Sequence, residues 1–348
     1  MTAGAPAAPM APGSLPPLAP EPRITVVMPI RDEAETIQLS LGAVLEQTWP
    51  GERVEVRVVD GMSSDGTRER VRETIDRHAG RDVRLLDNPE RIVPSALNRG
   101  LKDVEADVVV RVDGHCEIAP DYLERCVEAL VATGADCVGG PIRTIGETRL
   151  ARAIARAQSS PFGVGGARFR TGTGRGRWVD TLAFGAYRAE VFEAIGGFDE
   201  ELVRNQDDEF NFRLIQAGGR IWLDPAIRSR YWSRASLGGL ARQYFQYGAF
   251  KVRVMQKRGG VASGRHLVPA AFVLAVAAAL VAAGLGKPWP AVALLGAYGL
   301  GALAAALVAA RDEPAAAPLV AAAFPVLHFG YGLGFLAGLW RFRRGFRR

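Results

Sequence analysis

The sequence predicts an α/β fold, in which a mostly parallel sheet is flanked by helices, followed by a carboxyl-terminal transmembrane helical segment. In the first third of the chain, β-type runs alternate with helical stretches. Successive strands end about thirty residues apart, the length of one βα unit. The last third contains three apolar runs of about twenty residues, each long enough to cross a bilayer. These observations predict a sheet domain joined to membrane helices.

Four strands are expected in the first third of the chain. The fourth contains three consecutive valines, a composition typical of a strand that is buried on both faces. The expected strands cover residues 24–30, 54–60, 83–87 and 107–113. Helices connect these strands, because apolar residues recur at helical spacing, for example at Ile37, Leu41 and Val44. The expected helices cover residues 35–47, 67–77 and 94–102.

The middle of the chain continues this alternation. The expected elements are a helix at 122–131, a strand at 137–141, strand-like sequence at 178–187 and a helix at 191–195. Residues 159–177 are rich in Gly, Ser, Thr and Arg, which predicts a mobile loop. The acid cluster Asp207-Asp208-Glu209 precedes a helical apolar pattern. We therefore expect these acids at the amino end of a helix, where the helix dipole stabilises negative charge.

Asp113, Gly114 and His115 follow the fourth strand. In open parallel sheets, ligands bind beyond the carboxyl ends of the strands. Asp113 and His115 can present an oxygen and a nitrogen to one divalent cation, because Gly114 places no side chain between them. The alternative is a turn that Asp113 begins, in which Gly114 supplies a positive φ and His115 is merely exposed.

Further acids collect at the same predicted edge of the sheet. Glu33, Asp60 and Asp65 lie at or just past strand ends, as Asp113 does. Each has an ordinary alternative, since Asp65 suits a helix N-cap and Glu33 suits the first turn of a helix. Four acids on one edge nevertheless favour a site where a nucleotide could lie.

Composition and motifs exclude other functions. The formal net charge is +6 and 43 residues are basic, but no zinc-finger spacing, RNA-binding signature or lysine-rich arm occurs. Nucleic acid is therefore not an expected partner. Neither Gly-x-Gly-x-x-Gly after the first strand nor a Gly-Lys-Ser/Thr phosphate loop is present, so no dinucleotide or ATP-hydrolysing site is indicated. Three cysteines without metal-site spacing suggest a reducing compartment.

Several motifs resemble the family-2 glycosyltransferases, inverting nucleotide-sugar enzymes with the GT-A fold, over residues 23–255. Pro29-Ile-Arg-Asp32-Glu33 is similar to the family's Pro-x-x-Asn-Glu. The run from Asp60 to Thr67 matches its Asp-(Gly/Asp)-x-Ser-x-Asp-Gly-Thr. Further similar segments are Ala96-Leu-Asn98-Arg-Gly100, Gly196-Gly-Phe-Asp199-Glu200 and Gln206-Asp207-x-Glu209-Phe210-x-x-Arg213.

Asp113-Gly-His115 departs from the family's usual Asp-x-Asp. Together with residues 231–234 and 242–248, this variant resembles the succinoglycan-biosynthesis-type, membrane-anchored branch, which extends lipid-linked sugars.

The resemblance implies a role for each candidate residue. Asp207 would be the general base that deprotonates the acceptor hydroxyl, because inversion needs one base. Asp113 and His115 would hold a divalent cation, Mn²⁺ or Mg²⁺, that bridges the diphosphate of the donor. A carboxylate with an imidazole suits Mn²⁺ better than the harder Mg²⁺. The nucleotide-sugar would be bound by Pro29, Glu33, Asp60, Asp65, Asn98 and Asp113.

The three apolar runs cover residues 267–286, 289–310 and 315–339. Buried helices of a second soluble domain are the alternative, but nothing else in the chain could cover their Ala/Leu/Val surface. Basic residues before the first run fit a cytoplasmic start. The basic tail at 341–348 also favours the cytoplasm, whereas three spans would place it outside. Either one segment is re-entrant or interfacial, or the charge rule fails here.

The expected organisation has five parts and places the protein in the inner (plasma) membrane as a multi-pass protein with a cytoplasmic catalytic domain. The parts are a disordered Pro/Ala leader at 1–22, a GT-A glycosyltransferase domain at 23–235, an interfacial basic and aromatic segment at 236–265, two or three transmembrane helices at 266–340 and the basic tail at 341–348.

The expected function is the metal-dependent, inverting transfer of a single sugar from a nucleotide-sugar, in particular a UDP-sugar, to a polyprenyl-diphosphate-linked saccharide. This would serve exopolysaccharide or cell-envelope glycan synthesis. Processive synthases carry Gln-x-x-Arg-Trp before their membrane helices, which residues 243–247 lack. The alternatives are a nucleotidyltransferase, which needs a glycine-rich loop where this chain has residues 29–33, and a non-catalytic scaffold, against which the retained acids argue.

Overall fold

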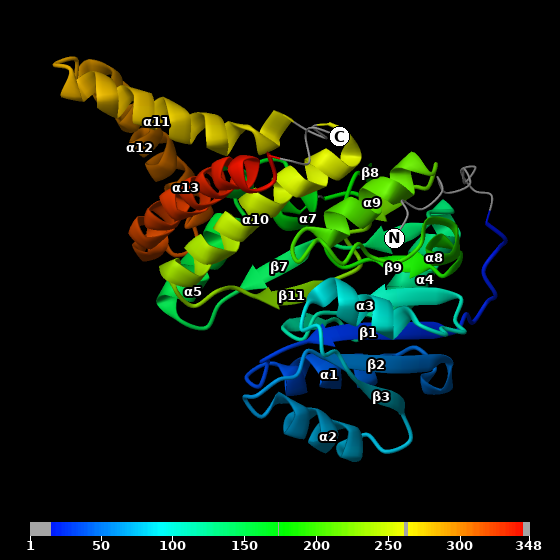
Figure 1. Cartoon of the computed structure of the whole chain (residues 1–348). Coiled ribbons are helices and arrows are strands. Elements are labelled where there is room, and N and C mark those ends of the chain that lie inside the picture. The colour runs from blue at the N-terminus through cyan, green and yellow to red at the C-terminus, as the bar shows by residue number, and fades with distance from the viewer. Residues whose placement is uncertain (1–14, 173, 261–263, 344–348) are drawn as a thin grey trace. The chain divides into compact units, whose positions relative to one another are not determined.

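The amino-terminal strands pair in parallel around β1 (Figure 1). The computed structural model describes residues 15–172, 174–260 and 264–343. The first four strands are β1 (Ile24–Ile30), β2 (Val54–Asp60), β3 (Asp82–Asp87) and β4 (Val108–Arg111). Ile30 pairs with Asp60, and Asp60 pairs with Asp87. Three predicted strand ends therefore lie at one level of the sheet.

Helices cover both faces of this sheet. The connecting helices are α1 (Ile37–Leu45), α2 (Thr67–Arg77) and α3 (Val93–Leu101). Val56 of β2 lines a small cavity together with Leu45 of α1, whereas Val59 of β2 lies against Gly100 of α3. Residues three apart on a strand point to opposite faces, so α1 and α3 lie on opposite sides of the sheet.

Within the described residues the main sheet has eight strands in the order β3-β2-β1-β4-β9-β6-β10-β8, and a smaller sheet has the order β5-β11-β7. In the main sheet only β9 and β8 run against the other strands. The predicted mostly parallel sheet flanked by helices is therefore confirmed. The further elements are β5 (Cys116–Ile118), β6 (Cys137–Gly139), β7 (Ile142–Ile145), β8 (Arg177–Val179), β9 (Ala186–Arg188), β10 (Ile221–Leu223), β11 (Ser229–Trp232), η1 (Gly51–Arg53), α4 (Tyr122–Thr133), α8 (Glu190–Ile195) and α9 (Gln206–Gln216).

The chain divides into two compact units. The first comprises residues up to 143 together with 172–231, and it contains the main sheet. The second comprises residues 144–171 together with the chain from 232 onward. The segment 144–171 thus groups with the carboxyl-terminal helices, although in sequence it lies inside the predicted glycosyltransferase domain.

The second unit is built of helices. They are α5 (Arg149–Gln158), α6 (Pro161–Val164), α7 (Arg168–Thr171), α10 (Leu237–Arg258), η2 (Gly264–His266), α11 (Val268–Gly284), α12 (Trp289–Ala309), η3 (Pro314–Ala316) and α13 (Ala317–Arg341). Three helical segments of the described chain, at 264–284, 289–309 and 314–341, are long and apolar enough to cross a membrane. The predicted carboxyl-terminal helices that could span a membrane are therefore confirmed.

Residues 159–177 are more regular than the predicted mobile loop. The Ser160 hydroxyl accepts a hydrogen bond from the Phe162 N–H at 3.2 Å and begins α6, with Pro161 in the first turn. The helix α7 follows. Most of the predicted disordered leader and the last five residues lie outside the described residues. Within the described part of the leader, the carbonyls of Pro16 and Pro22 accept hydrogen bonds from the side chains of Arg188 and Trp49.

Candidate active site

Arg111 and Asp113 form an ion pair at the carboxyl end of β4. Arg111 Nε donates to Asp113 Oδ1 at 2.9 Å, and Arg111 Nη2 donates to Asp113 Oδ2 at 3.2 Å. Residues two apart on an extended chain point to the same side, which brings the two groups together. The third guanidinium nitrogen, Arg111 Nη1, is buried and has no hydrogen-bond partner within the described chain. Both N–H groups of this nitrogen are therefore unpaired within the described residues, which is rare for a buried cation.

Pro29 lies in β1 and defines where β4 leaves the sheet. Pairing between the two strands ends at Val27 and Arg111. Pro29 has no N–H to continue this ladder. The Val112 N–H still donates to the Val27 carbonyl at 3.1 Å, and Asp113 lies beyond this bond. Pro29 itself is buried within the strand, and its predicted role in nucleotide-sugar binding stays a prediction.

Asp207 lies in the first turn of α9, as the sequence predicts for the acid cluster. The helix begins after Asn205, which has a φ of +61°. Asp207 Oδ1 accepts a hydrogen bond from the Asp208 N–H at 2.9 Å. Burial alone would lower the pKa of Arg111, but the charges of Asp113 and Asp207 outweigh burial and raise that pKa above its ordinary value. Arg111, Asp113 and Asp207 therefore form one charged cluster.

His115 and Glu33 meet beside this cluster. His115 Nδ1 lies 2.8 Å from Glu33 Oε1, and the His115 ring packs edge-on against Tyr231 with 4.8 Å between ring centroids. Gly114 permits this approach, because a Cβ at that position would lie 2.9 Å from Ile30 Cγ2. Glu33 and His115, which were each predicted just past a strand end, are thus brought into direct contact by the loops after β1 and β4.

Asp65 joins the loops after β1 and β2. Its Oδ2 accepts a hydrogen bond from the Ala34 N–H at 3.0 Å, and its Oδ1 accepts one from the Thr67 N–H at 3.1 Å. The Thr67 hydroxyl in turn accepts the Glu33 N–H at 2.8 Å. Burial raises the pKa of Asp65, but the hydrogen bonds from Thr67 and Ala34 outweigh burial and hold that pKa below its usual range. Asp65 is therefore suited to remain ionised at neutral pH.

Asp60 is fully buried at the end of β2. Its carboxylate accepts hydrogen bonds from the Ser63 N–H and hydroxyl and from Arg68 Nη1, the last at 2.7 Å. Arg68 also pairs with Asp87 at 2.8 Å, so it ties the ends of β2 and β3 together. This geometry gives Asp60 the task of shaping the loop after β2. A direct contact of Asp60 with the nucleotide stays a prediction.

Asn98 joins α3 to the loop before α9. Its Nδ2 donates to the Phe198 carbonyl and to Glu200 Oε1, both at 2.8 Å, and its Oδ1 accepts the Phe198 N–H at 2.7 Å. Gly197 fits only because it lacks a Cβ, which would lie 2.5 Å from Asn98 Oδ1. Both ends of the amide are therefore used inside the protein. The predicted contact of Asn98 with the nucleotide-sugar stays a prediction.

Asp113 and His115 are the residues predicted to bind the cation, and their role as ligands stays a prediction. No group of three or more His, Cys, Asp or Glu side chains is arranged for a metal ion in the described part of the chain. Mg²⁺ sites of phosphoryl enzymes often use one or two carboxylates and take the remaining ligands from substrate phosphates and water. The oxygen and nitrogen donors of Asp113 and His115 fit a cation that binds together with a diphosphate.

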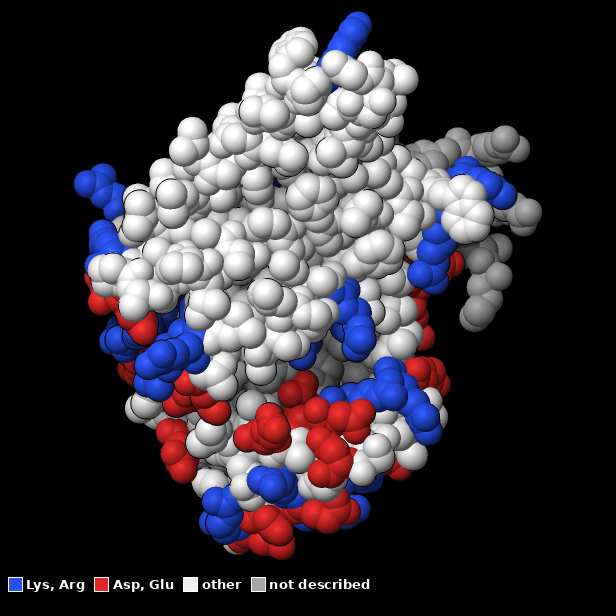
Figure 2. All heavy atoms as spheres, turned by 90° about the vertical axis from the view of Figure 1, so that its left-hand side faces the viewer, with Lys and Arg blue, Asp and Glu red and all other residues white. Residues whose placement is uncertain are grey.

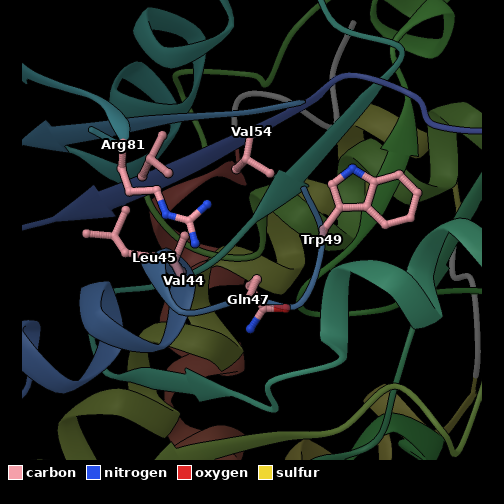
Figure 3. Close-up of a pocket in the computed structure, with 7 residues that line it drawn as sticks. Val44, Leu45, Gln47, Trp49, Val54 and Arg81 are labelled. Carbon is pink, nitrogen blue, oxygen red and sulfur yellow. The ribbon is translucent and has the colours of Figure 1, made fainter. Parts of the chain in front are cut away.

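A small cavity near α1 does not belong to this site. Figure 3 shows the side chains that line it, among them Leu45 and Gln47 of the α1 region, Val54 of β2 and Arg81. Val54 begins β2, whereas Asp60 ends it. The cavity therefore lies at the edge of the sheet opposite to the strand ends that carry the acids.

Sequence reasoning assigned no role to three supporting arginines, although Arg213 is part of a motif that resembles the family. Arg111 supports Asp113, Arg68 supports Asp60, and Arg213 pairs with Glu209 at 2.7 Å while it donates to the carbonyls of Ile195 and Gly197. A signal for Arg111 was present, because it interrupts an otherwise apolar strand two residues before Asp113. The i, i+4 spacing of Glu209 and Arg213 was a second signal. Arg68 gave none beyond its place in a charged helix.

The chain is similar to several known proteins. Residues 25–196 match the family described as Glycosyl transferase family 2. The chain is 36% identical over 327 residues to the succinoglycan biosynthesis protein ExoA of Rhizobium meliloti (strain 1021), covering 92% of this chain and 96% of that protein. It is 28% identical over 240 residues to a Methanococcus voltae protein, covering 67% of this chain and 74% of that protein. The latter is named dolichyl N-acetyl-alpha-D-glucosaminyl phosphate 3-beta-D-2,3-diacetamido-2,3-dideoxy-beta-D-glucuronosyltransferase.

Among solved structures, the mannosyltransferase PcManGT from Pyrobaculum calidifontis, in complex with GDP-Man and Mn²⁺, is similar with a TM-score of 0.60. The two sequences are 21% identical, and the superposition covers 97% of this chain and 91% of that chain. This likeness shows that the two proteins share a fold.

Proposed function

The chain belongs to glycosyl transferase family 2, and we propose that it transfers a single sugar, with inversion, from a nucleotide-sugar to a lipid-linked saccharide at the cytoplasmic face of a membrane. The observation that carries the proposal is the cluster of Arg111, Asp113 and Asp207. It lies beyond the carboxyl end of β4, where open α/β sheets bind nucleotide ligands. The succinoglycan biosynthesis protein among the relatives supports a role in exopolysaccharide or cell-envelope glycan synthesis.

Asp207 would act as the general base. In an inverting transfer one carboxylate takes the proton of the acceptor hydroxyl while that oxygen attacks the anomeric carbon. The first turn of α9 stabilises the ionised carboxylate, because the amino end of a helix carries partial positive charge. The interaction with Arg111 favours the same ionised form.

The loops after β1 and β2 would bind the nucleotide. Glu33 and Asp65 are held in place by Thr67 and can accept hydrogen bonds from the N–H and O–H groups of a base and a ribose. We propose a UDP-sugar as the donor. The structural neighbour was solved with GDP-Man, so a test must include guanine nucleotides.

Asp113 and His115 would hold a divalent cation, Mn²⁺ or Mg²⁺. Such a cation, when bound, neutralises the charge that develops on the diphosphate leaving group. The pairs Asp113 with Arg111 and Glu33 with His115 set the positions of both ligand side chains before the donor binds.

The acceptor would be a polyprenyl-diphosphate-linked saccharide in the lipid of the inner membrane. Three helical segments of the described chain are apolar enough to cross a membrane, which supports attachment to lipid. The relative from Methanococcus voltae, whose name contains a dolichyl-phosphate sugar, supports an acceptor that is anchored by a polyprenyl chain.

The test uses the detergent-purified full chain, a panel of UDP- and GDP-sugars, Mn²⁺ or Mg²⁺, and a polyprenyl-diphosphate-linked sugar. We expect one donor to release its nucleoside diphosphate in a reaction that depends on the acceptor. Release of inorganic pyrophosphate would instead indicate nucleotidyl transfer. A chain that binds the donor but turns over no acceptor across the whole panel would contradict the proposal.

A further inference from the structure

Helix α13 packs closely along α10 within the second unit. A Cβ at Gly334 would lie 2.0 Å from the Phe245 carbonyl oxygen, and one at Gly338 would lie 2.5 Å from that of Ala249. Both pairs advance by four residues in the same direction, so the two helices run parallel and side by side (Figure 1). The carboxyl-terminal half of α13 therefore lies at the same membrane depth as α10.

Helix α10 is too highly charged to lie in hydrocarbon. Its 22 residues include five cationic side chains, namely Arg242, Lys251, Arg253, Lys257 and Arg258. A single Arg or Lys at the centre of a membrane helix costs at least about 2.5–3.5 kcal/mol. Long cationic side chains beside aromatic residues are instead typical of helices at the membrane surface. The neighbouring half of α13 is then at the surface as well.

The amino-terminal half of α13 packs on another basic helix, α5. Ile154 and Ala157 of α5 share one buried cluster with Val320 and Phe324 of α13. Arg156 of α5 donates to the Ala309 carbonyl at 3.1 Å and to Glu313 Oε2 at 3.3 Å. These contacts attach the turn between α12 and α13 to a helix that carries three arginines.

His328, near the middle of α13, contacts the short helix α6, which is flanked by turns. His328 Nε2 lies 2.9 Å from the Phe162 carbonyl oxygen of the four-residue helix α6, and His328 Nδ1 lies 2.8 Å from the Tyr298 hydroxyl. If α13 crossed the bilayer, α6 and the turns around it would lie near the membrane midplane. Irregular backbone is costly there, because its N–H and C=O groups lack water.

The hairpin of α11 and α12 has the opposite character. Its outer half is exposed and apolar, with Leu285 at 78%, Trp289 at 70%, Val292 at 71% and Leu300 at 72% exposure. A 21-residue helix is about 32 Å long, close to the thickness of a bilayer core. Figure 2 shows a face of the molecule on which a wide area carries almost no charged side chains. Only lipid fits an apolar surface of this length.

We propose that α11 and α12 are the two spans and that α13 lies with α10 and α5 at the cytoplasmic membrane surface. The carboxyl end of the chain then stays on the same side as the turn between α12 and α13. This topology rests on the membrane attachment and cytoplasmic orientation proposed above. It also gives the basic end of the chain the cytoplasmic location that the charge rule favours, without a third span.

The test is the labelling of single introduced cysteines in intact cells with a membrane-impermeant maleimide. The positions are Lys287→Cys at the hairpin tip, Asp312→Cys at the α12–α13 turn, Arg343→Cys after α13, and Glu69→Cys on the exposed face of α2 as the reference for the first unit. The native cysteines Cys116, Cys126 and Cys137 are buried, so the unaltered chain gives the background. We expect only Lys287→Cys to react from outside, and the other three to react after the membrane is opened.

Four other outcomes distinguish a wrong topology from a wrong premise about membrane attachment or orientation. Labelling of Arg343→Cys from outside, together with Lys287→Cys, would establish three spans and overturn the topology. Protection of Lys287→Cys in intact cells would show a hairpin that does not cross, and would also overturn it. Release of the protein by alkaline carbonate, or labelling of Glu69→Cys from outside, would instead contradict the membrane attachment or orientation in the proposed function.

Discussion

Arg111 contacts the carboxylate of Asp113 directly and interacts with Asp207 through its charge. A buried guanidinium needs compensating charge, and the two aspartates supply it. The Arg111 guanidinium thereby restrains Asp113, which is proposed to hold the metal ion, and Asp207, which is proposed to take the proton. Among the described residues, the buried Nη1 atom of Arg111 has no hydrogen-bond partner, although buried N–H groups rarely stay unpaired.

Asp207→Asn should reduce sugar transfer by at least about 10²-fold to 10⁴-fold, because a general base commonly contributes that much. The substitution keeps the shape of the side chain and removes its proton acceptor, so donor affinity should change little. Parallel measurements of donor binding and transfer rate test this. Asp208→Asn is the matched control in the same helical turn and should be far milder. A greater loss in Asp208→Asn would show that the base lies one residue further along.

Asp113→Ala should abolish turnover, while His115→Asp should retain much of it and shift the metal preference toward Mg²⁺. The physical reason is that a carboxylate is a harder ligand than an imidazole. Transfer rates across a titration of Mn²⁺ and Mg²⁺ measure both effects. If His115→Ala left the metal dependence unaltered, His115 would serve only to position Glu33, and Asp113 would be the sole protein ligand.

Asp65 should make the stability of the fold depend on pH in the acidic range. Folding lowers its pKa, so its ionised form stabilises the fold above its ordinary value of about 4, and this contribution is lost as the pH falls through the lowered pKa. Asp65→Asn can accept through only one terminal atom, so either Ala34 or Thr67 loses its partner. We expect a lower melting temperature for Asp65→Asn at pH 7 and convergence with the wild type as the pH falls through the lowered pKa of Asp65. Asp76→Asn, at an exposed position of α2, is the control. A gap in melting temperature that did not depend on pH would refute this linkage.

Helices α10 and α13 approach through glycines. Gly330, Gly334 and Gly338 recur every four residues along one face of α13, and each lies against the backbone of α10. Small residues at this spacing let two helix backbones come close and pack well, in lipid as in water. The segment 144–171 adds α5 and α6 to the same core through Ile154 and Phe162. The helical core formed by α5, α6, α10 and α13 is therefore assembled from distant parts of the chain.

Gly334→Leu should destabilise this helical core by at least about 1–3 kcal/mol, the usual cost of overpacking. The first added carbon would lie 2.0 Å from a backbone oxygen of α10, which cannot move aside without separating the helices. Gly299→Leu on α12 is the matched control, since a Cβ there meets nothing within 4 Å. Thermal unfolding of both variants in detergent provides the measurement. Equal stability of the two variants would mean that α10 and α13 are not packed in this way.

We propose that this enzyme adds one sugar and then releases its product. Residues 243–247 lie in α10 and do not carry the Gln-x-x-Arg-Trp of processive synthases. If α11 and α12 are the only spans, the membrane part also supplies too few helices to enclose a polymer channel. With pure lipid-linked acceptor and excess donor, we expect mass spectrometry to show products extended by one sugar. A series of longer products would exclude the addition of a single sugar.

Local patterns in the sequence determined much of this protein. The apolar runs predicted β1, β2 and β3 to within one residue, and β4 lies inside a predicted strand that was three residues longer, because strand and helix periodicity are properties of neighbouring residues. The acids at the start of α9 and the apolar carboxyl-terminal helices followed in the same way. The family motifs predicted the GT-A fold and the glycosyltransferase family.

The tertiary structure alone decided which of these residues meet. The joining of Arg111 and Asp113 to Asp207, the contact of Glu33 with His115, and the capture of Asn98 by a distant loop depend on how separate segments pack. The grouping of 144–171 with the carboxyl-terminal helices, and the position of α13 along α10, are of the same kind. Hydropathy measures the composition of a helix. Whether that helix faces lipid or another helix depends on residues far away in sequence, which no local pattern contains.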